Sequence, residues 1–213
     1  MIELADVSKS FGEKALWTNV NYTFSAGQVY AITGRSGSGK STLLNCIGGL
    51  DRVDSSDVLV GGTPMSHASA RERRKLRPTT IGYLFQDYAL GSSKSVEYNL
   101  RLAQPKASEG QCEDALGTVG LSGYAQKITG ELSGGEQQRV ALARLIILPR
   151  SVVLADEPTG ALDNQNGEMV VSMLRQFADK GSTVIVSTHS AEVAAAADAV
   201  LNLDNLDCGA LTQ

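Results

Sequence analysis

The chain has 213 residues, 42% of them hydrophobic, a formal net charge of -4 and a pI of about 5.2. This composition suits a globular protein with a full core, and the acidic balance gives no basic surplus that would favour nucleic acid as a main partner. Three cysteines, odd in number and without a CxxC pair, suggest neither a disulfide framework nor a zinc site. We therefore expect a reducing, cytoplasmic setting.

No segment of the sequence is typical of a signal peptide or a membrane span. The chain begins Met-Ile-Glu-Leu-Ala-Asp, without a basic region ahead of an apolar one. No apolar run approaches the ~20 residues that cross a bilayer as a helix. If the protein works at a membrane, we expect another protein to supply the spanning part.

The N-terminal third begins with strands. Alternating apolar and polar residues predict antiparallel strands over residues 2–7 and 20–24, joined near residues 11–14. Residues 58–62 predict another short strand that ends in a turn. Residues 67–77 predict a basic helical patch, for which both a solvated helix face and a partner contact are open interpretations.

The strongest motif follows an apolar strand predicted over residues 29–33. It reads G-x-x-x-x-G-K-S and leads into a helical pattern, which is typical of a phosphate-binding loop. Its glycines let backbone N–H groups curl around an anion, and the helix directs its positive end to the same place. Lys40 would reach the β- and γ-phosphates, and the Ser41 hydroxyl would hold Mg²⁺. We expect nucleotide contacts from Gly34, Ser36, Gly37, Ser38, Gly39, Lys40, Ser41 and Thr42.

The remaining chain alternates strands and helices. Strands are predicted over residues 80–85, 152–155, 184–186 and 199–203, and helical segments over 95–129, 133–148, 169–177 and 191–198. The continuous apolar runs of the middle strands suit a parallel sheet that is buried on both faces. This alternation predicts an α/β fold, which we interpret as one domain over residues 1–213 with a helical subdomain at roughly 87–150.

A pair of acids ends one of these strands. Asp156 and Glu157 follow the apolar run Val152–Ala155, and the carboxyl ends of strands are where α/β proteins build their sites. An acid at this position is the usual Mg²⁺ partner of a phosphate loop, so Asp156 would hold the metal through water. Glu157 is placed to polarise the water that attacks the γ-phosphate.

The segment at residues 132–139 reads Leu-Ser-Gly-Gly-Glu-Gln-Gln-Arg. Its glycine-rich helix N-terminus is a second anion site. With this segment the whole chain resembles the ATP-binding cassette (ABC) ATPases. The resemblance implies a P-loop NTPase fold of ABC type, with a mixed central sheet, an N-terminal antiparallel β subdomain and a helical signature subdomain. It also implies that two chains pack head to tail around ATP, with Ser133 and Gly135 of each covering the other's γ-phosphate.

Four further residues take their roles from the resemblance. Gln86 resembles the Q-loop glutamine, which contacts Mg²⁺ or the attacking water and senses the membrane partner. His189 resembles the switch histidine that reaches the γ-phosphate, and Asp163 resembles the D-loop residue near the dimer interface. Phe11 matches the aromatic residue that stacks on adenine. Residues differ from common family choices at Ser56, Thr129 and Ser190, and at Thr129 the common residue is proline.

Finer resemblances indicate a branch of the family. Residues 155–163 and 47–51 resemble the lipoprotein-release, macrolide-export, bacteriocin-export and cell-division ATPases, and residues 83–90 look closest to small bacteriocin-export ATPases. The branch implies an ATP-hydrolysing subunit that powers a separate integral membrane permease from the cytoplasmic face of the membrane. The cargo would be a peptide, a lipoprotein or an antimicrobial compound. Because the chain ends just past its last predicted strand, we expect no fused permease.

The motifs leave one other function open and disfavour two. An ABC-type signalling ATPase that drives a membrane partner in cell-envelope or cell-division control, without transport, would carry identical motifs and stays open. A soluble ABC protein acting on DNA or ribosomes is disfavoured, because such proteins usually carry a coiled-coil insertion or a second cassette. A GTPase is disfavoured because no N-K-x-D motif occurs. The sequence does not indicate the cargo, whose contacts would lie on the membrane subunit.

Overall fold

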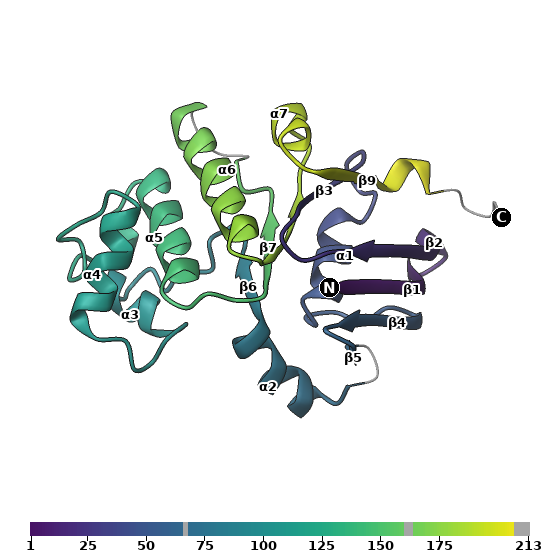
Figure 1. Ribbon diagram of the computed structural model, residues 1–213, viewed down its shortest axis with the longest axis horizontal. Helices are drawn as coiled ribbons and strands as arrows, with labels where there is room; N and C mark the ends of the chain where they lie inside the picture. The colour runs from purple at the N-terminus through teal and green to yellow at the C-terminus, as the bar shows by residue number, and fades with distance from the viewer. Residues whose placement is uncertain (66–67, 160–163, 207–213) are drawn as a thin grey trace.

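The computed structural model describes residues 1–65, 68–159 and 164–206. Figure 1 shows three parts: an antiparallel sheet that contains the N-terminal strands, a parallel sheet in the middle, and a group of helices on the far side. The α/β fold predicted from the sequence is confirmed.

The antiparallel sheet has four strands in the order β2-β1-β4-β5. They are β1 (Ile2–Phe11), β2 (Lys14–Phe24), β4 (Ser55–Val60) and β5 (Thr63–Pro64). The first two are longer than predicted, because register shifts interrupt the alternation of β1 after Leu4 and again around Lys9. Such bulges place two residues opposite one and hide the period of two on which the prediction depended.

The parallel sheet has five strands in the order β6-β7-β8-β3-β9. They are β3 (Val29–Thr33), β6 (Ile81–Leu84), β7 (Val152–Asp156), β8 (Thr183–Ser187) and β9 (Ala199–Asn202). The resemblance implied a mixed central sheet. In the structure every described pair of these five strands is parallel, and the antiparallel strands form a separate sheet. The physical reason is connection length, since helical crossovers return the chain in the same direction whereas the tight turn after Phe11 reverses it.

Four helices connect the strands outside the helical subdomain. They are α1 (Lys40–Ile47), α2 (Ala70–Thr80), α6 (Asn164–Asp179) and α7 (Ala191–Ala195). Helix α2 is the basic patch predicted from the sequence, and it extends to Thr80 although Pro78 lies inside it. Figure 1 shows α2 projecting from the body of the molecule below the two sheets.

The helical subdomain consists of α3 (Val96–Arg101), α4 (Glu109–Thr118), the 3-10 turn η1 (Thr129–Glu131) and α5 (Gly134–Ile146). The helical segment predicted over residues 95–129 contains two short helices, and Gln104 and Pro105, at which the sequence pattern is broken, lie between them. Side-chain oxygens of Ser95, Ser108 and Ser133 cap the three α-helices, each accepting a backbone N–H from the first turn. These caps explain where each helix begins.

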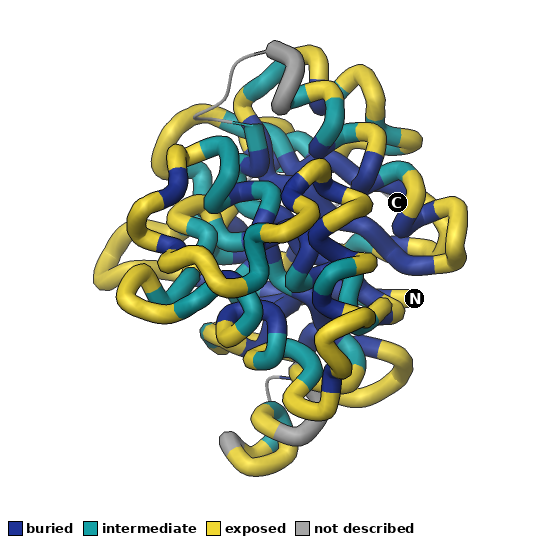
Figure 2. Tube along the Cα trace, turned by 90° about the vertical axis from the view of Figure 1, so that its left-hand side faces the viewer, coloured by how far each residue is buried: buried dark blue, intermediate teal, exposed yellow. Residues whose placement is uncertain are grey.

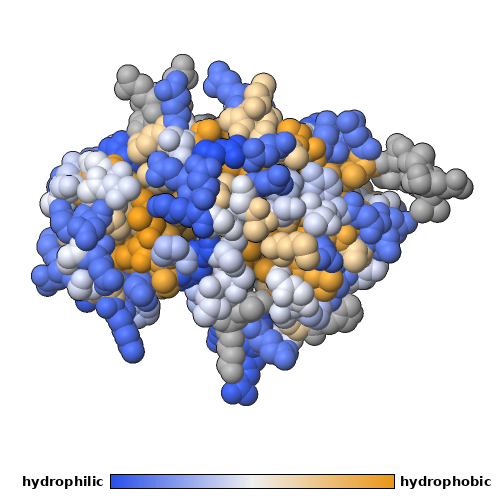
Figure 3. Space-filling view, viewed as in Figure 1, coloured by the Kyte–Doolittle hydropathy of each residue, from blue (hydrophilic) through white to orange (hydrophobic). Residues whose placement is uncertain are grey.

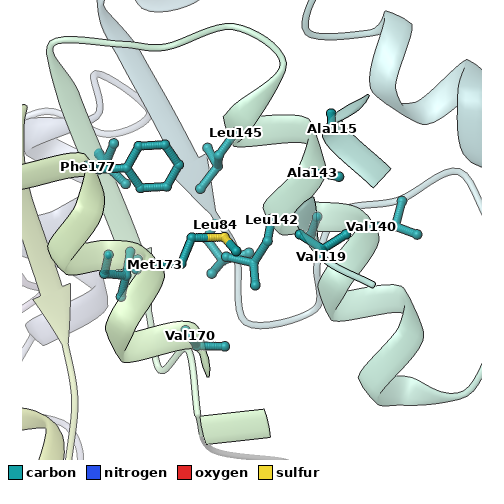
Figure 4. Close-up of a cluster of buried hydrophobic side chains, with 14 of the residues drawn as sticks. Leu84, Ala115, Val119, Val140, Leu142, Ala143, Leu145, Val170, Met173 and Phe177 are labelled. Carbon is teal, nitrogen blue, oxygen red and sulfur yellow. The ribbon is translucent and has the colours of Figure 1, made fainter. Parts of the chain in front are cut away.

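The buried side chains form two clusters, which the burial pattern in Figure 2 places in the interior of the molecule. One cluster joins α1 to both sheets. The other joins α4, α5 and α6 to the opposite face of the parallel sheet, and Figure 4 shows Leu142 and Leu145 of α5 facing Met173 and Phe177 of α6. The helix that begins at the signature is therefore packed directly against the parallel sheet, at β6.

The outer surface carries hydrophilic side chains over much of the face in Figure 3, with apolar residues between them. Within the described part of the chain, no helix is long and apolar enough to cross a membrane.

Candidate active site

The phosphate-binding loop connects β3 to α1. Gly39 is the N-cap of α1 with a φ of 94°, and it supplies no side-chain cap. The Lys40 ammonium donates hydrogen bonds to the carbonyl oxygens of Gly34 (2.8 Å) and Arg35 (3.3 Å). The N–H groups at the start of this helix are thus left for an anion, and the lysine lies against the same loop.

Trp17 of β2 is packed beneath this loop and was not singled out from the sequence. Its indole is fully buried, and its Nε1 has no hydrogen-bond partner among the described residues. A Cβ at Gly39 would lie 2.8 Å from that nitrogen. The motif glycine is therefore required twice, once for its positive φ and once for the space that the indole fills.

The buried hydroxyl of Ser38 also has no described hydrogen-bond partner, and it lies against Gly34. A Cβ on Gly34, whose φ is 145°, would be 2.6 Å from this oxygen. A hydroxyl held inside a loop of backbone N–H groups without a partner fits an arriving phosphate oxygen, because such an oxygen would accept its proton.

Asp156 lies at the centre of the candidate metal position. Its Oδ1 accepts a hydrogen bond from the Ser41 hydroxyl (2.9 Å) and another from the Ser187 hydroxyl. Asp156 ends β7, and the parallel register pairs it with Ser187 at the end of β8. Hydroxyl and carboxylate oxygens are the ligands that Mg²⁺ prefers, so this group fits the expected metal.

Tyr83 lies close to the same carboxylate. Burial of its ring, and secondarily the negative charge of Asp156, raise the pKa of the Tyr83 phenol well above its usual range. The phenol therefore stays protonated, and it donates a hydrogen bond of 2.9 Å to Asn45 Oδ1 on α1. This bond connects β6 to the helix that follows the phosphate loop.

The side chains of Glu157 and His189 are in close contact beside Asp156. His189 Nδ1 is 2.8 Å from Glu157 Oε2, and the backbone N–H of His189 donates to the same oxygen (3.3 Å). The Glu157 side chain is 13% exposed and that of His189 is 70% exposed. Glu157 has a φ of 46°, an unfavourable value for a non-glycine residue, and its N–H donates to the Ser187 carbonyl (2.9 Å). Backbone strain of this kind gathers at functional sites.

Gln86 and Phe11 lie at the margins of the site. Gln86 is exposed and follows β6, whose last residue, Leu84, pairs with Ala155 beside Asp156. Phe11 is 58% exposed at the end of β1 and pairs with Lys14 across the hairpin. An aromatic ring left this exposed is available for stacking.

A pocket of about 270 Å³ separates the hairpin from the loop. Lys14 and Leu16 line one side of it and Arg35 and Ser38 the other. Asp204 also lines the pocket, and its carboxylate accepts a hydrogen bond from the Arg35 backbone N–H (2.8 Å). The pocket is continuous with the phosphate loop, so it is placed to take the part of a nucleotide that lies beyond the phosphates.

The signature helix α5 begins in a different way from α1. The Ser133 hydroxyl accepts the Glu136 N–H (3.3 Å), and the Glu136 carboxylate accepts the Ser133 N–H (2.8 Å), which is a complete capping box. The Ser133 bonds, and after them the Tyr124 hydroxyl at 3.0 Å, lower the pKa of Glu136. No hydrogen bond or ion pair among the described residues joins Ser133 or Gly135 to residues 34–42.

The signature helix is nevertheless connected to the strand that carries the acids. Gln138, almost fully buried in α5, donates a hydrogen bond to the carbonyl oxygen of Pro158, the residue after Glu157. The structure thus brings Lys40, Ser41, Asp156, Glu157 and His189 to one edge of the parallel sheet and keeps the signature loop apart from them.

Comparison with known proteins decides the family. The family model described as ABC transporter matches residues 17–160, more than half of the chain. The chain belongs to the ABC transporter family. Its structure is similar to the dimeric structure of MJ0796, a bacterial ABC transporter cassette, with a TM-score of 0.86, 33% sequence identity and coverage of 95% of each chain. It is equally similar, at 32% identity, to a post-hydrolysis state of MJ0796 bound to ADP and Pi.

Curated relatives of this ABC cassette include macrolide export ATP-binding/permease proteins named MacB. The chain is 38% identical to the MacB protein of Salmonella typhimurium and 37% identical to that of Escherichia coli K12. Each match covers 95% of this chain and 33% of the relative. The cassette therefore spans about one third of the length of the curated relatives that it matches.

Sequence reasoning did not find every residue of the site. The hydroxyls of Ser187 and Ser41 both donate hydrogen bonds to Asp156. A serine at the end of an apolar strand is not distinctive in sequence. Its place at the carboxyl end of a predicted parallel strand is the one signal that could have indicated it. The predicted D-loop residue Asp163 lies outside the described residues.

Proposed function

We propose that this ABC cassette binds ATP with Mg²⁺ and hydrolyses it to power a membrane permease. The observation that carries the proposal is the arrangement at one edge of the parallel sheet. The Ser41–Asp156 hydrogen bond joins the phosphate loop to the end of β7, and the Glu157–His189 contact lies at the next residue of the chain. Binding, metal and water-activating groups are thus adjacent, as phosphoryl transfer requires.

Each residue would have a separate role. Backbone N–H groups of residues 34–42 would hold the β- and γ-phosphates, and Lys40 would move from its carbonyl partners to these oxygens. Ser41, Asp156 and Gln86 would hold Mg²⁺, which neutralises phosphate charge when bound. Phe11 would stack on adenine above the pocket between the hairpin and the loop.

Glu157 would position and polarise the attacking water, a contribution worth about 10²–10⁴ in rate. Its carboxylate is held by the imidazole and the backbone N–H of His189, so the two side chains would act together at the γ-phosphate. Water attacks phosphorus, the bond to the leaving ADP oxygen breaks, and Glu157 receives the proton of the water.

Two copies would form the working enzyme. Within one chain, Ser133 and Gly135 make no described hydrogen bond to the phosphate loop, yet they present a second anion-binding helix N-terminus. A head-to-tail pair would place them over the partner's γ-phosphate, with Asp163 near the interface. The similarity to the MJ0796 cassette, whose structure is dimeric, supports this arrangement.

The partner would be an integral membrane permease, to which the cassette would bind from the cytoplasmic side of the membrane. A groove of about 290 Å³ lies next to the segment that follows Gln86; Phe85, Ala89, Leu102, Arg144 and Arg150 are among its lining residues. We propose this groove as the permease contact, with the whole chain acting as one cassette domain. Export is favoured because the curated MacB relatives are named macrolide exporters; bacteriocin cargo stays a prediction from residues 83–90.

The variant Glu157→Gln tests the proposal, because it keeps the shape of the side chain and removes its basicity. We expect ATP hydrolysis to fall at least about a hundredfold, while ATP binding persists and dimers accumulate on size-exclusion chromatography with ATP. Hydrolysis at the parent rate would show that the base assignment is wrong. Purification of the cassette from membranes together with its bound protein would identify the partner. A partner that activates a cell-wall enzyme without moving cargo would favour the signalling alternative.

A further inference from the structure

Two segments that are far apart in sequence lie side by side in the helical subdomain. Residues 92–96 follow the Gln86 segment, and residues 127–130 lead into the signature. Backbone hydrogen bonds join them from Thr129 N–H to the Lys94 carbonyl (2.9 Å), from Gly130 N–H to the Ser92 carbonyl (2.8 Å) and from Val96 N–H to the Lys127 carbonyl (3.0 Å). A Cβ at Gly130 would be 2.9 Å from the Ser92 oxygen, so the two backbones are in close contact.

Asn99 of α3 fastens this contact from inside. Its side chain is 0% exposed, as is Thr129. The amide oxygen accepts the Gly91 N–H (2.7 Å), and the amide nitrogen donates to the Gly91 carbonyl (3.2 Å) and to the Thr129 hydroxyl (2.9 Å). One buried amide therefore bonds to the segment after Gln86 and to the segment before Ser133.

Arg144 makes a second connection from the signature helix itself. Its guanidinium donates to the carbonyl oxygens of Tyr88 and Ala89, both at 2.7 Å. These two residues have φ values of 63° and 45°, which are unfavourable for side chains with a Cβ, so the turn after Gln86 needs such support. The two ends of the segment 88–91 are thus held by groups connected to α5.

Thr129 lies four residues before Ser133 and contributes two groups to this contact. Its hydroxyl accepts a hydrogen bond from the Asn99 amide, and its backbone N–H donates one to the Lys94 carbonyl. Both its side chain and its backbone are therefore bonded to the segment that follows Gln86.

We propose that Asn99 and Thr129 are positioning residues for the signature loop. Their contact fixes the loop relative to the Gln86 segment, and thereby sets how well Ser133 and Gly135 meet the nucleotide of a second copy. This inference rests on the ATP-sandwiched dimer of the proposed function. A loosened contact would leave ATP binding by one chain unchanged and weaken the pairing of two chains around ATP.

Thr129→Val is the decisive variant, since Asn99→Ala removes several buried bonds and endangers the fold. Valine keeps the shape of threonine and removes only the hydroxyl that accepts from Asn99. ATP hydrolysis at saturating ATP is measured as a function of protein concentration, and ATP affinity is measured by calorimetry. We expect the protein concentration at half-maximal rate to rise about tenfold with unchanged ATP affinity. A purely structural defect would lower the rate at all concentrations without this shift.

Thr183→Val is the matched control. Thr183 is also fully buried, but its hydroxyl has no hydrogen-bond partner among the described residues, so its loss should leave the half-maximal concentration unchanged. Thr129→Ser keeps a hydroxyl and should restore most of the parent behaviour. The proposal is overturned if Thr129→Val shifts no more than Thr183→Val, or if Thr129→Ser shifts as much as Thr129→Val. A parent rate per chain that is independent of concentration would instead overturn the dimer proposal itself.

Discussion

The two glycine-rich helix starts of this cassette look alike in sequence and differ in structure. Helix α1 begins at a left-handed glycine, Gly39, without a side-chain cap. Helix α5 begins at Ser133 with a complete capping box closed by Glu136. The first leaves its N–H groups to a ligand, whereas the second satisfies part of them within the chain.

This difference suits the N-termini of α1 and α5 to different roles. An uncapped helix start is stable only where the surrounding fold supports it, and Trp17 and the parallel sheet supply that support for α1. A capped start keeps its shape without a ligand. The start of the signature helix can therefore keep its shape before a second copy binds, while the free N–H groups at the start of α1 find hydrogen-bond partners only in a bound ligand.

The largest effect should come from Lys40→Ala, which tests whether the uncapped end is the one that binds ATP. Loss of a charged hydrogen-bond donor at the phosphates should weaken ATP binding about a hundredfold in calorimetry. Lys180→Ala, at an exposed position after α6, is the matched control and should leave the affinity unchanged. Equal affinities for the two variants would show that this loop is not the nucleotide site.

A smaller effect is expected when each helix start receives a methyl group. Gly39→Ala forces a side chain into a φ of 94° and against the Trp17 indole, so we expect a loss of about 2 kcal/mol in the free energy of unfolding. Gly134→Ala meets nothing within 4 Å and should be neutral or slightly stabilising. Urea unfolding followed by circular dichroism measures both, and similar losses would contradict the contrast between the two ends.

Removal of a cap should cost less, about 1 kcal/mol, and it separates stability from function. Ser133→Ala and Ser108→Ala each remove the serine of a capping box, at the starts of α5 and α4. Both should lower the free energy of unfolding by a similar amount. We expect only Ser133→Ala to lower ATP turnover as well, by about tenfold, because it alone would face a phosphate. Equal turnover in the two variants would remove Ser133 from the proposed site.

The smallest effect concerns the strand that leads into the uncapped end. The Asp198 carboxylate accepts hydrogen bonds from Arg175 and from the Val29 N–H at the start of β3, both at 2.7 Å. The Arg175 bond, followed by the Val29 bond, lowers the pKa of Asp198. A lowered folded-state pKa gives stability that is present above the unfolded-state value of about 3.9 and is lost as the pH falls through the folded-state value.

Asp198→Asn should therefore flatten the fall of stability in acid, below about pH 4, and cost less than about 1 kcal/mol at neutral pH because the pair is partly exposed. Urea unfolding at a series of pH values measures this. Asp179→Asn, at an exposed position at the end of α6, serves as the control. An unchanged acid slope in Asp198→Asn would mean that this pair does not hold the strand.

The sequence predicted those parts of the molecule that depend on neighbouring residues. The loop before Lys40 and the acids after the apolar run of β7 are local patterns, and the parallel sheet followed from continuous apolar runs. The register of two parallel strands then brings Asp156 beside Ser187, a pairing that no local pattern contains. The full length of β1 was missed for a related reason, since its bulges are stabilised by partner strands on both sides.

Contacts between segments that are distant in the sequence could not be predicted from local patterns. The Asn99–Thr129 bond joins residues that are thirty positions apart, and each residue alone is an ordinary polar side chain in a helical region. The relative orientation of the strands also differs in part from the expectation. The resemblance implied one mixed central sheet, whereas the described strands divide into an antiparallel and a parallel sheet. In both cases tertiary packing, not local preference, decides the outcome.

Trp17 gives this cassette a built-in optical probe. It is the only tryptophan of the chain, and its indole lies directly beneath Gly39 with its N–H unpaired among the described residues. Indole emission depends on local polarity and hydrogen bonding, so the tryptophan fluorescence of the unlabelled protein reports on the surroundings of the phosphate loop. Nucleotide binding and release can then be followed in real time without attaching a dye.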